Sequence, residues 1–233
     1  MEIFFRLLLG HLLADFTFQT NYIAAWKRNS RVGLLTHVVM HPLCYIPLLW
    51  PYLNETWVVI GGLSFNGWGS IAIATVLHLL EDWFRVDMVN RGWPDNILFY
   101  SWDQAVHLVV LFIFSPIRTH PLVNQWPLLG IFFVIVTHFA TVTVYFIEKG
   151  LYGGEYPETE EKYVSILQRL VVWMAFFLPY PWWILVLAFI LISFGRHVLT
   201  RRIDFSVTSV LLGNGIAIAC GIMTRFVLNR HLL

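Results

Sequence analysis

Residues 3–22 read IFFRLLLGHLLADFTFQTNY, an apolar run that contains His11 and Asp15. A run of about 20 largely apolar residues is long enough to cross the hydrocarbon core of a bilayer as a helix. Residues four apart share one face of a helix, so His11 and Asp15 lie on the same face. Ionisable groups at membrane depth are costly and usually mark function. The segment therefore predicts a membrane helix with a polar functional face.

The same spacing recurs in the next three apolar segments, where it pairs His37 with His41, His78 with Asp82, and Asp103 with His107. One such pair is often a buried hydrogen-bonded contact that fixes helix packing. Four pairs at similar depth instead indicate a shared site for metal or protons. Turned inward, the four helix faces would form one pocket of imidazoles and carboxylates.

The composition places these groups in a membrane. Hydrophobic residues make up 58% of the 233 residues and charged residues only 12%, with a mean hydropathy of +0.68. A soluble domain should carry about 25% charge. The formal net charge of +1 excludes a nucleic-acid partner, which needs a concentrated basic patch. Cys44 and Cys220 lie in apolar runs without a C-x-x-C motif, so neither a disulfide framework nor a thiolate metal site is expected.

Apolar segments of membrane length predict an all-α fold, a polytopic transmembrane helical bundle of about 7 to 8 spans. The predicted segments are 3–22, 33–53, 57–83, 97–115, 126–148, 164–178, 180–195 and 205–226. We expect a single membrane domain over residues 1–233, in which residues 1–115 build the polar pocket and residues 116–233 supply scaffold helices. No cleavable signal pattern precedes the first segment, which is expected to remain in the mature protein.

Two features of these segments leave the span count open. Gly61-Gly62 and the stretch from Asn66 to Gly69 interrupt the third segment, which predicts a short reentrant piece followed by a helix from about Ser70. The sixth and seventh segments are short and joined by Pro179-Tyr180-Pro181, as in a tight helical hairpin. Seven spans are therefore the alternative to eight.

Loop charge predicts the orientation. The odd-numbered connections between segments hold ten Lys and Arg residues, whereas the even-numbered connections hold one. The positive-inside rule then puts the odd connections in the cytoplasm and both termini outside. The pairs in the second, third and fourth segments fall in the cytoplasmic half of the membrane. The implied pocket opens toward the cytoplasm.

Imidazole with carboxylate is the ligand set of zinc, manganese and iron sites, and i, i+4 spacing lets one helix give two ligands to one ion. Eight groups exceed what one tetrahedral ion needs. The sequence predicts either two ions about 3.5 to 4 Å apart or one ion with carboxylates that orient its histidines. Haem is disfavoured, because His37 and His41 point the same way whereas two haem ligands approach from opposite faces.

Three further polar residues are candidates for substrate binding. Gln19 lies two turns beyond His11 on the same face, and Gln104 adjoins Asp103. Either amide could instead bond within the bundle. Lys27 belongs to a basic loop at the cytoplasmic side, which topology alone explains, although it could also attract phosphate headgroups. By contrast, the i, i+4 spacing of Glu81 and Arg85 predicts a surface ion pair at a helix end.

The stretch from Gly10 to Thr20, GHLLADFTFQT, is followed by Lys27, H-x-x-x-H, H-x-x-x-D and D-Q-x-x-H motifs. This order resembles an uncharacterised family of bacterial inner-membrane proteins, a domain of unknown function that opens with H-L-L-x-D-F-x-x-Q. The resemblance covers roughly residues 1–115 and implies a multipass protein of the bacterial inner membrane. It supplies no established activity. A more distant likeness in motif style is to membrane-bound metal-dependent hydrolases.

Together these patterns predict metal-dependent hydrolysis of a membrane lipid or lipid-linked substrate near the cytoplasmic leaflet. The metal would activate water, and Asp15 or Asp103 would act as general base. A divalent-cation or proton transporter using the same pocket is the alternative, and a noncatalytic membrane scaffold is a third possibility. The sequence leaves open the oligomeric state and which small-molecule or lipid-linked compound is the substrate.

Overall fold

The computed structural model describes residues 1–116, 124–153, 156–157, 159–199 and 206–228. Helices account for most of these residues, which confirms the predicted all-α class. The chain divides into two compact units, Met1–Ile131 and Phe132–Leu233. The single membrane domain expected over residues 1–233 stays a prediction.

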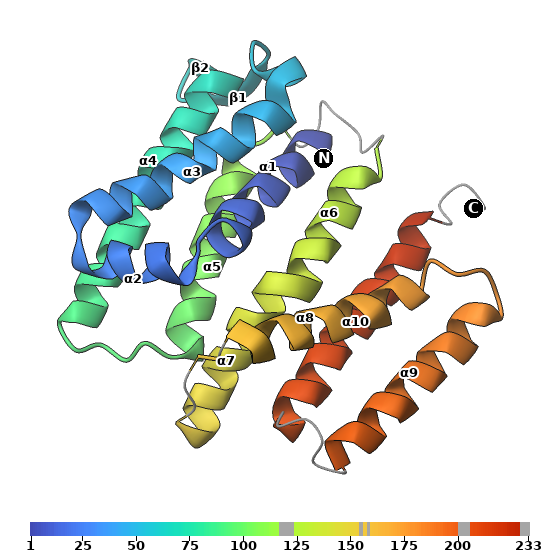
Figure 1. Ribbon diagram of the computed structural model, residues 1–233. Helices are drawn as coiled ribbons and strands as arrows, with labels where there is room; N and C mark the ends of the chain where they lie inside the picture. Colours follow the sequence, from blue (N-terminus) through green and yellow to red (C-terminus); the bar gives the residue numbers. More distant parts are fainter. Residues whose placement is uncertain (117–123, 154–155, 158, 200–205, 229–233) are drawn as a thin grey trace. The chain divides into compact units, whose positions relative to one another are not determined.

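The first unit contains four helices that run alongside one another and a short helix between the first two (Figure 1). Their bounds are α1 Glu2–Leu12, extended by a π-helical turn at Leu13–Thr17, α2 Asn21–Asn29, α3 Arg31–Leu49, α4 Gly67–Asn90 and α5 Ile97–Ile113. A 3-10 turn, Trp50–Tyr52, follows α3, and α6 (Trp126–Val134) begins in this unit. The predicted first span thus ends as a helix at Thr17, and α2 occupies part of what was expected to be a loop.

Side-chain caps fix where three of these helices begin. The Ser30 hydroxyl accepts hydrogen bonds from the first amides of α3, and the side chains of Asn66 and Asn96 do the same for α4 and α5. Such caps satisfy backbone donors that a helix start leaves open. At the α2–α3 corner, a Cβ on Gly33 would lie 2.6 Å from the backbone of Trp26. The close approach of these two helices therefore requires glycine at this position.

A β-hairpin takes the place of the predicted reentrant piece. Strands β1 (Thr56–Ile60) and β2 (Leu63–Asn66) pair antiparallel, and Gly61 and Gly62 form the turn with φ of 58° and 84°. Two-residue hairpin turns demand positive φ, and the β-branched residues of β1 favour a strand. Helix α4 then starts at Gly67 rather than at Ser70.

An apolar core lies at the hairpin end of the first unit. It comprises Ile3, Phe4, Leu7, Tyr45, Leu49, Leu53, Trp57, Ile71 and Leu111. Leu7 precedes His11 by one helical turn, whereas Tyr45 and Leu111 follow histidines by one turn on their own helices. The inward faces of the helices therefore change from polar to apolar within a single turn, and the core closes one end of the polar region.

The second unit continues from α6 through another π-helical turn, Ile135–Phe139, into α7 (Ala140–Tyr152). It also contains α8 (Thr159–Ala175), α9 (Trp182–Leu199) and α10 (Val207–Leu228). Helix α7 ends at Gly153, whose φ of 71° is the left-handed conformation typical of a helix C-terminus. Helix α8 packs against both α10 and α9.

Within the described residues, three helical segments are long and apolar enough to cross a membrane: Arg31–Tyr52, Trp126–Tyr152 and Val207–Leu228. Ile97–Ile113 and Trp182–Ser193 are shorter apolar helices. On α3, Leu35, Val39 and Leu43 are exposed, whereas His37 and His41 are fully buried. This outward apolar face and inward polar face reverse the pattern of a soluble helix and are consistent with a membrane protein.

Candidate metal centre

All eight predicted ligands lie on the inward faces of α1, α3, α4 and α5 or in the π-helical turn that extends α1. Every one of them is buried: His11, Asp15, His37, His41, His78, Asp82, Asp103 and His107. Together with Glu81 they form three overlapping groups, and within each group one ligand atom from every member lies within 4.8 Å of the others. The first group is His11, Asp15, His41 and His78, the second is His37, His78 and Asp82, and the third is Glu81, Asp82, Asp103 and His107. Such buried groups could hold a metal ion. Their role as ligands stays a prediction.

Asp15 is the centre of the first group. Its Oδ1 lies 3.0 Å from His41 Nε2 and 3.2 Å from His37 Nε2, and its Oδ2 lies 3.3 Å from His11 Nε2. Asp15 sits within the π-helical turn that ends the first helix. Turns of this kind are uncommon and often occur at functional sites. His78 Nε2 lies 3.8 Å from Asp15 Oδ1, so one carboxylate faces four imidazoles from three helices.

Asp82 is the centre of the second group. Its Oδ2 lies 3.2 Å from His37 Nε2 and 3.6 Å from His78 Nε2, and the two histidine Nε2 atoms are 3.4 Å apart. His37 therefore lies between Asp15 and Asp82. His78, a member of both the first and the second group, joins these groups as well.

The third group consists of Glu81, Asp82, Asp103 and His107. Glu81 Oε2 lies 2.9 Å from His107 Nε2, and the Glu81 side chain is buried. The predicted placement of Glu81 at the surface is therefore wrong. The sequence did carry a signal for Glu81, because it follows His78 by three residues and so shares its helix face.

The short distances in the first and third groups are not hydrogen bonds. His41 Nε2 and Asp15 Oδ1 are 3.0 Å apart, yet neither atom has a hydrogen-bond partner among the described residues. The same is true of His107 Nε2 and Glu81 Oε2. Two ligands on one ion at about 2.0–2.1 Å lie about 3.0–3.4 Å from each other. These imidazole nitrogens and carboxylate oxygens therefore have the spacing and the free lone pairs that binding of one shared divalent ion requires.

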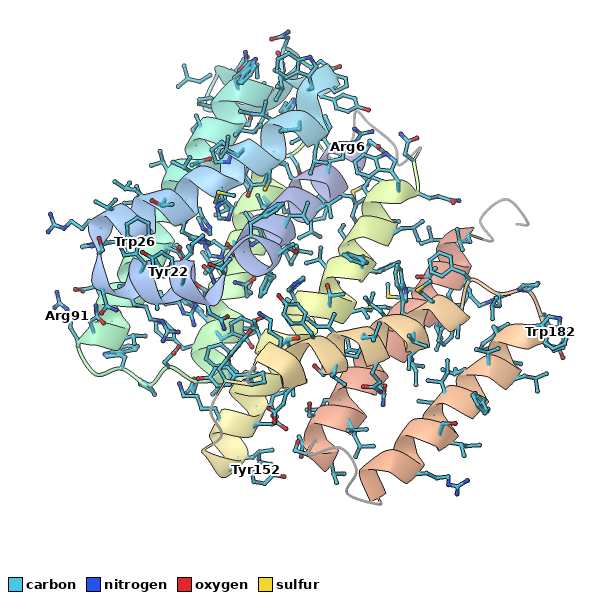
Figure 2. The ribbon with its side chains drawn as sticks, viewed as in Figure 1. Arg6, Tyr22, Trp26, Arg91, Tyr152 and Trp182 are labelled. Carbon is cyan, nitrogen blue, oxygen red and sulfur yellow. The ribbon has the colours of Figure 1, made fainter. Side chains whose placement is uncertain are left out.

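Lys27 reaches this cluster from α2. Its Nζ lies 3.1 Å and 3.3 Å from the two oxygens of Asp82. Figure 2 shows Tyr22 and Trp26 on the same short helix, and Tyr22 is largely exposed. The sequence placed Lys27 in a basic loop and did not indicate its contact with Asp82. Its predicted role in substrate binding stays a prediction.

A second cation, Arg85, contacts the third group through Asp103. Arg85 contacts Asp103 Oδ2 at 3.3 Å and Asp95 at 3.1 Å. The Gln104 amide donates to the same Asp103 oxygen at 3.0 Å. Asp103 Oδ1, in contrast, has no hydrogen-bond partner in the described part of the chain. Asp103 is therefore anchored through one oxygen while the other remains available.

Gln19 lies just beyond the π-helical turn that carries Asp15, and its buried Oε1 has no hydrogen-bond partner within the described residues. It belongs to none of the three ligand groups. Its predicted role in substrate binding is neither supported nor contradicted by these contacts and stays a prediction.

The cluster has an excess of negative charge. Its four carboxylates, those of Asp15, Glu81, Asp82 and Asp103, face the two cations Lys27 and Arg85. With neutral histidines the sum is −4 + 2 = −2. Buried carboxylates require compensating charge. A divalent cation would supply it.

Comparison with known proteins adds one finding. A protein-family model described as "Protein of unknown function (DUF3307)" matches residues 3–130. No curated protein and no solved structure matches the chain. The matched residues nearly coincide with the first unit, Met1–Ile131, which holds all three ligand groups.

Proposed function

The chain belongs to the DUF3307 family, which confirms the resemblance seen in its motifs, and we propose that it is a membrane-embedded metal-dependent hydrolase. Its substrate is a lipid or lipid-linked compound at the cytoplasmic side of the bacterial inner membrane. The observation that carries the proposal is the buried cluster from four helices, in which imidazole and carboxylate atoms form three overlapping groups, each with its members within 4.8 Å of one another.

The chemistry of the cluster supports one or two divalent ions, with zinc, manganese and iron as the candidates for this ligand set. Asp15 and Asp82 are each shared among several histidines and suit the role of ligand. Such an ion lowers the pKa of bound water toward about 7 and polarises a scissile group.

Asp103 is the better candidate for general base than Asp15. Arg85 and Gln104 fix one Asp103 oxygen, which leaves the other oriented for a proton from water. Asp15, by comparison, faces four imidazoles and has less freedom to accept a proton. This assignment refines the earlier expectation that either carboxylate could be the base.

A transporter of divalent cations or protons is the second candidate, and a noncatalytic scaffold is the third. Transport requires a polar path to both sides of the membrane. The apolar core around Leu7, Tyr45 and Leu49 lies one turn from the ligands and interrupts such a path. This observation favours the enzyme.

The membrane architecture completes the proposal. Three described helices have the length and hydropathy of membrane spans, and the proposed bundle of seven or eight spans adds the two shorter apolar helices, α4, α8 and α1 with its π-helical extension. Helices shorter than 20 residues can take part when the bilayer thins locally or flanking polar side chains reach the interface. The function is tested by incubating purified protein with a bacterial lipid extract, with and without a chelator, and identifying products by mass spectrometry. Metal-dependent release of a water-soluble headgroup supports the proposal, and an unchanged extract contradicts it.

A further inference from the structure

A second polar site lies in the second unit, outside the residues that the family model matches. A cavity of about 180 Å³ opens between α7, α8 and the start of α10. Its polar lining includes Tyr145, Glu148, Glu161, Ser165, Arg169 and Ser209. None of these residues belongs to the metal cluster.

Arg169 lines the buried end of the cavity. Its side chain is almost fully buried, with 2% of its surface exposed. One terminal nitrogen, Nη2, donates to the Thr137 carbonyl at 3.0 Å and to the Thr141 hydroxyl at 2.6 Å. Within the described residues no carboxylate pairs with Arg169, and its Nε has no hydrogen-bond partner. A buried guanidinium without a counter-ion calls for an anion.

The opposite end of the cavity is acidic. Glu161 precedes Arg169 by two turns on the same face of α8, about 12 Å along the helix axis. Glu148 lies about 10 Å along α7 from Thr141, the residue that Arg169 contacts. Glu161 is exposed, and Glu148 accepts a hydrogen bond from Ser206. The cavity therefore has one cationic, buried end and one anionic end nearer the surface.

This polarity matches a ligand that carries both charges. A phosphate group suits the guanidinium, whose planar donors recognise phosphate oxygens. A primary ammonium suits the two carboxylates, because it donates three hydrogen bonds. We propose that this cavity binds an aminoalkyl phosphate, as carried by the headgroup of an ethanolamine phospholipid.

The position of the cavity favours the lipid form. Helix α7 belongs to a candidate membrane span that ends at Tyr152, so Glu148 lies near the membrane surface and Thr141 lies deeper. In a bilayer the amine of such a headgroup lies closer to water than the phosphate. The acidic end thus faces the amine, and Arg169 faces the phosphate. Intramembrane cations that face a cavity typically serve a ligand.

The test uses purified full-length protein in detergent, titrated with lipid and followed by native mass spectrometry. Dioleoyl phosphatidylethanolamine should bind at least about tenfold more tightly than the glycerol or choline analogue, because only the ethanolamine lipid offers a primary amine. Equal binding of the three lipids would overturn the proposal. Displacement by free O-phosphoethanolamine at a similar concentration would assign the same site to a soluble ligand, and resistance to it would assign the site to lipid.

Variants separate the two ends of the cavity. Arg169→Gln should weaken binding of every phospholipid by about tenfold or more. The double change Glu148→Gln and Glu161→Gln should instead remove the preference for ethanolamine over glycerol. Arg225→Gln is the matched control, since Arg225 contacts the carbonyls of Phe176 and Leu178 and the ring of Trp183 and does not line the cavity. If Arg169→Gln does not fold, the acidic pair still decides, and unchanged lipid preference in the double variant would refute the assignment.

Discussion

Lys27 Nζ lies 3.1 Å from Asp82 Oδ2, so an ammonium group already holds a carboxylate that belongs to two of the three ligand groups. A metal ion bound at Asp82 would either share this oxygen with Lys27 or displace the Lys27 ammonium group. The positive charge of Lys27 also opposes a cation nearby.

Replacing Lys27 with glutamine should therefore strengthen metal binding. We expect affinity to rise by about tenfold, roughly 1.4 kcal/mol, measured by competition with a chelator of known affinity. Arg28→Gln is the control, because Arg28 is half exposed and pairs with Asp95 rather than with a ligand. Weaker metal binding in Lys27→Gln would mean that Lys27 orients Asp82 for the ion instead of competing with it.

The protein should carry metal when purified gently. We expect about one or two equivalents of zinc, manganese or iron by elemental analysis, from the number of clustered ligands. Glu81→Gln should lower the content by about one equivalent if the third group holds its own ion. Asp87→Asn, on the same helix but paired with Arg91 near the surface, should leave the content unchanged. Less than about 0.2 equivalents in the unaltered protein after metal supplementation would remove the metal proposal.

The sequence predicted the pairing of ligands well because helix geometry is local. Spacing of four residues places His37 and His41 on one face whatever the rest of the chain does. Ionisable groups in apolar segments then turn inward because lipid cannot solvate them. The convergence of the four faces followed from these two rules.

Contacts between distant residues could not be predicted in the same way. Lys27 and Asp82 are separated by 55 residues, and no local pattern indicates that α2 brings them together. Glu81 was assigned to the surface because its spacing to Arg85 fits an ion pair as well as its spacing to His78 fits a shared helix face. The hairpin at Gly61 and Gly62 was misread because an apolar run with β-branched residues does not by itself distinguish strand from membrane segment.

The apolar core beside the cluster should contribute measurably to stability. Leu49→Ala removes a fully buried side chain and should destabilise the protein by about 2–5 kcal/mol. Leu43→Ala on the same helix removes a largely exposed side chain and should cost much less in detergent. Thermal unfolding of the two variants checks this difference. Equal destabilisation would place Leu43 in a contact with another protein chain or a bound lipid.

The predicted orientation can be tested by cysteine labelling of intact cells. In a background without Cys44 and Cys220, both of which are buried, a cysteine at position 91 should react only after the membrane is opened. A cysteine at position 54 should react with an impermeant reagent added outside, as the loop charges require. The opposite labelling pattern would place the histidine and carboxylate cluster in the outer half of the membrane and move the search for substrate to the other compartment.

The last prediction separates an enzyme from a transporter. His37→Ala and Asp103→Ala should each abolish lipid hydrolysis in detergent, where no gradient exists, while His138→Ala in the second unit should retain it. The double variant should lose little more than either single variant, because residues that act on one catalytic ion behave as a unit. Matching size-exclusion profiles would show that the variants remain folded. A transporter would instead give metal-dependent flux in sealed vesicles and no product from any lipid. Flux that persisted with both residues replaced would refute both functions, because each places His37 and Asp103 in the path of the ion or the substrate.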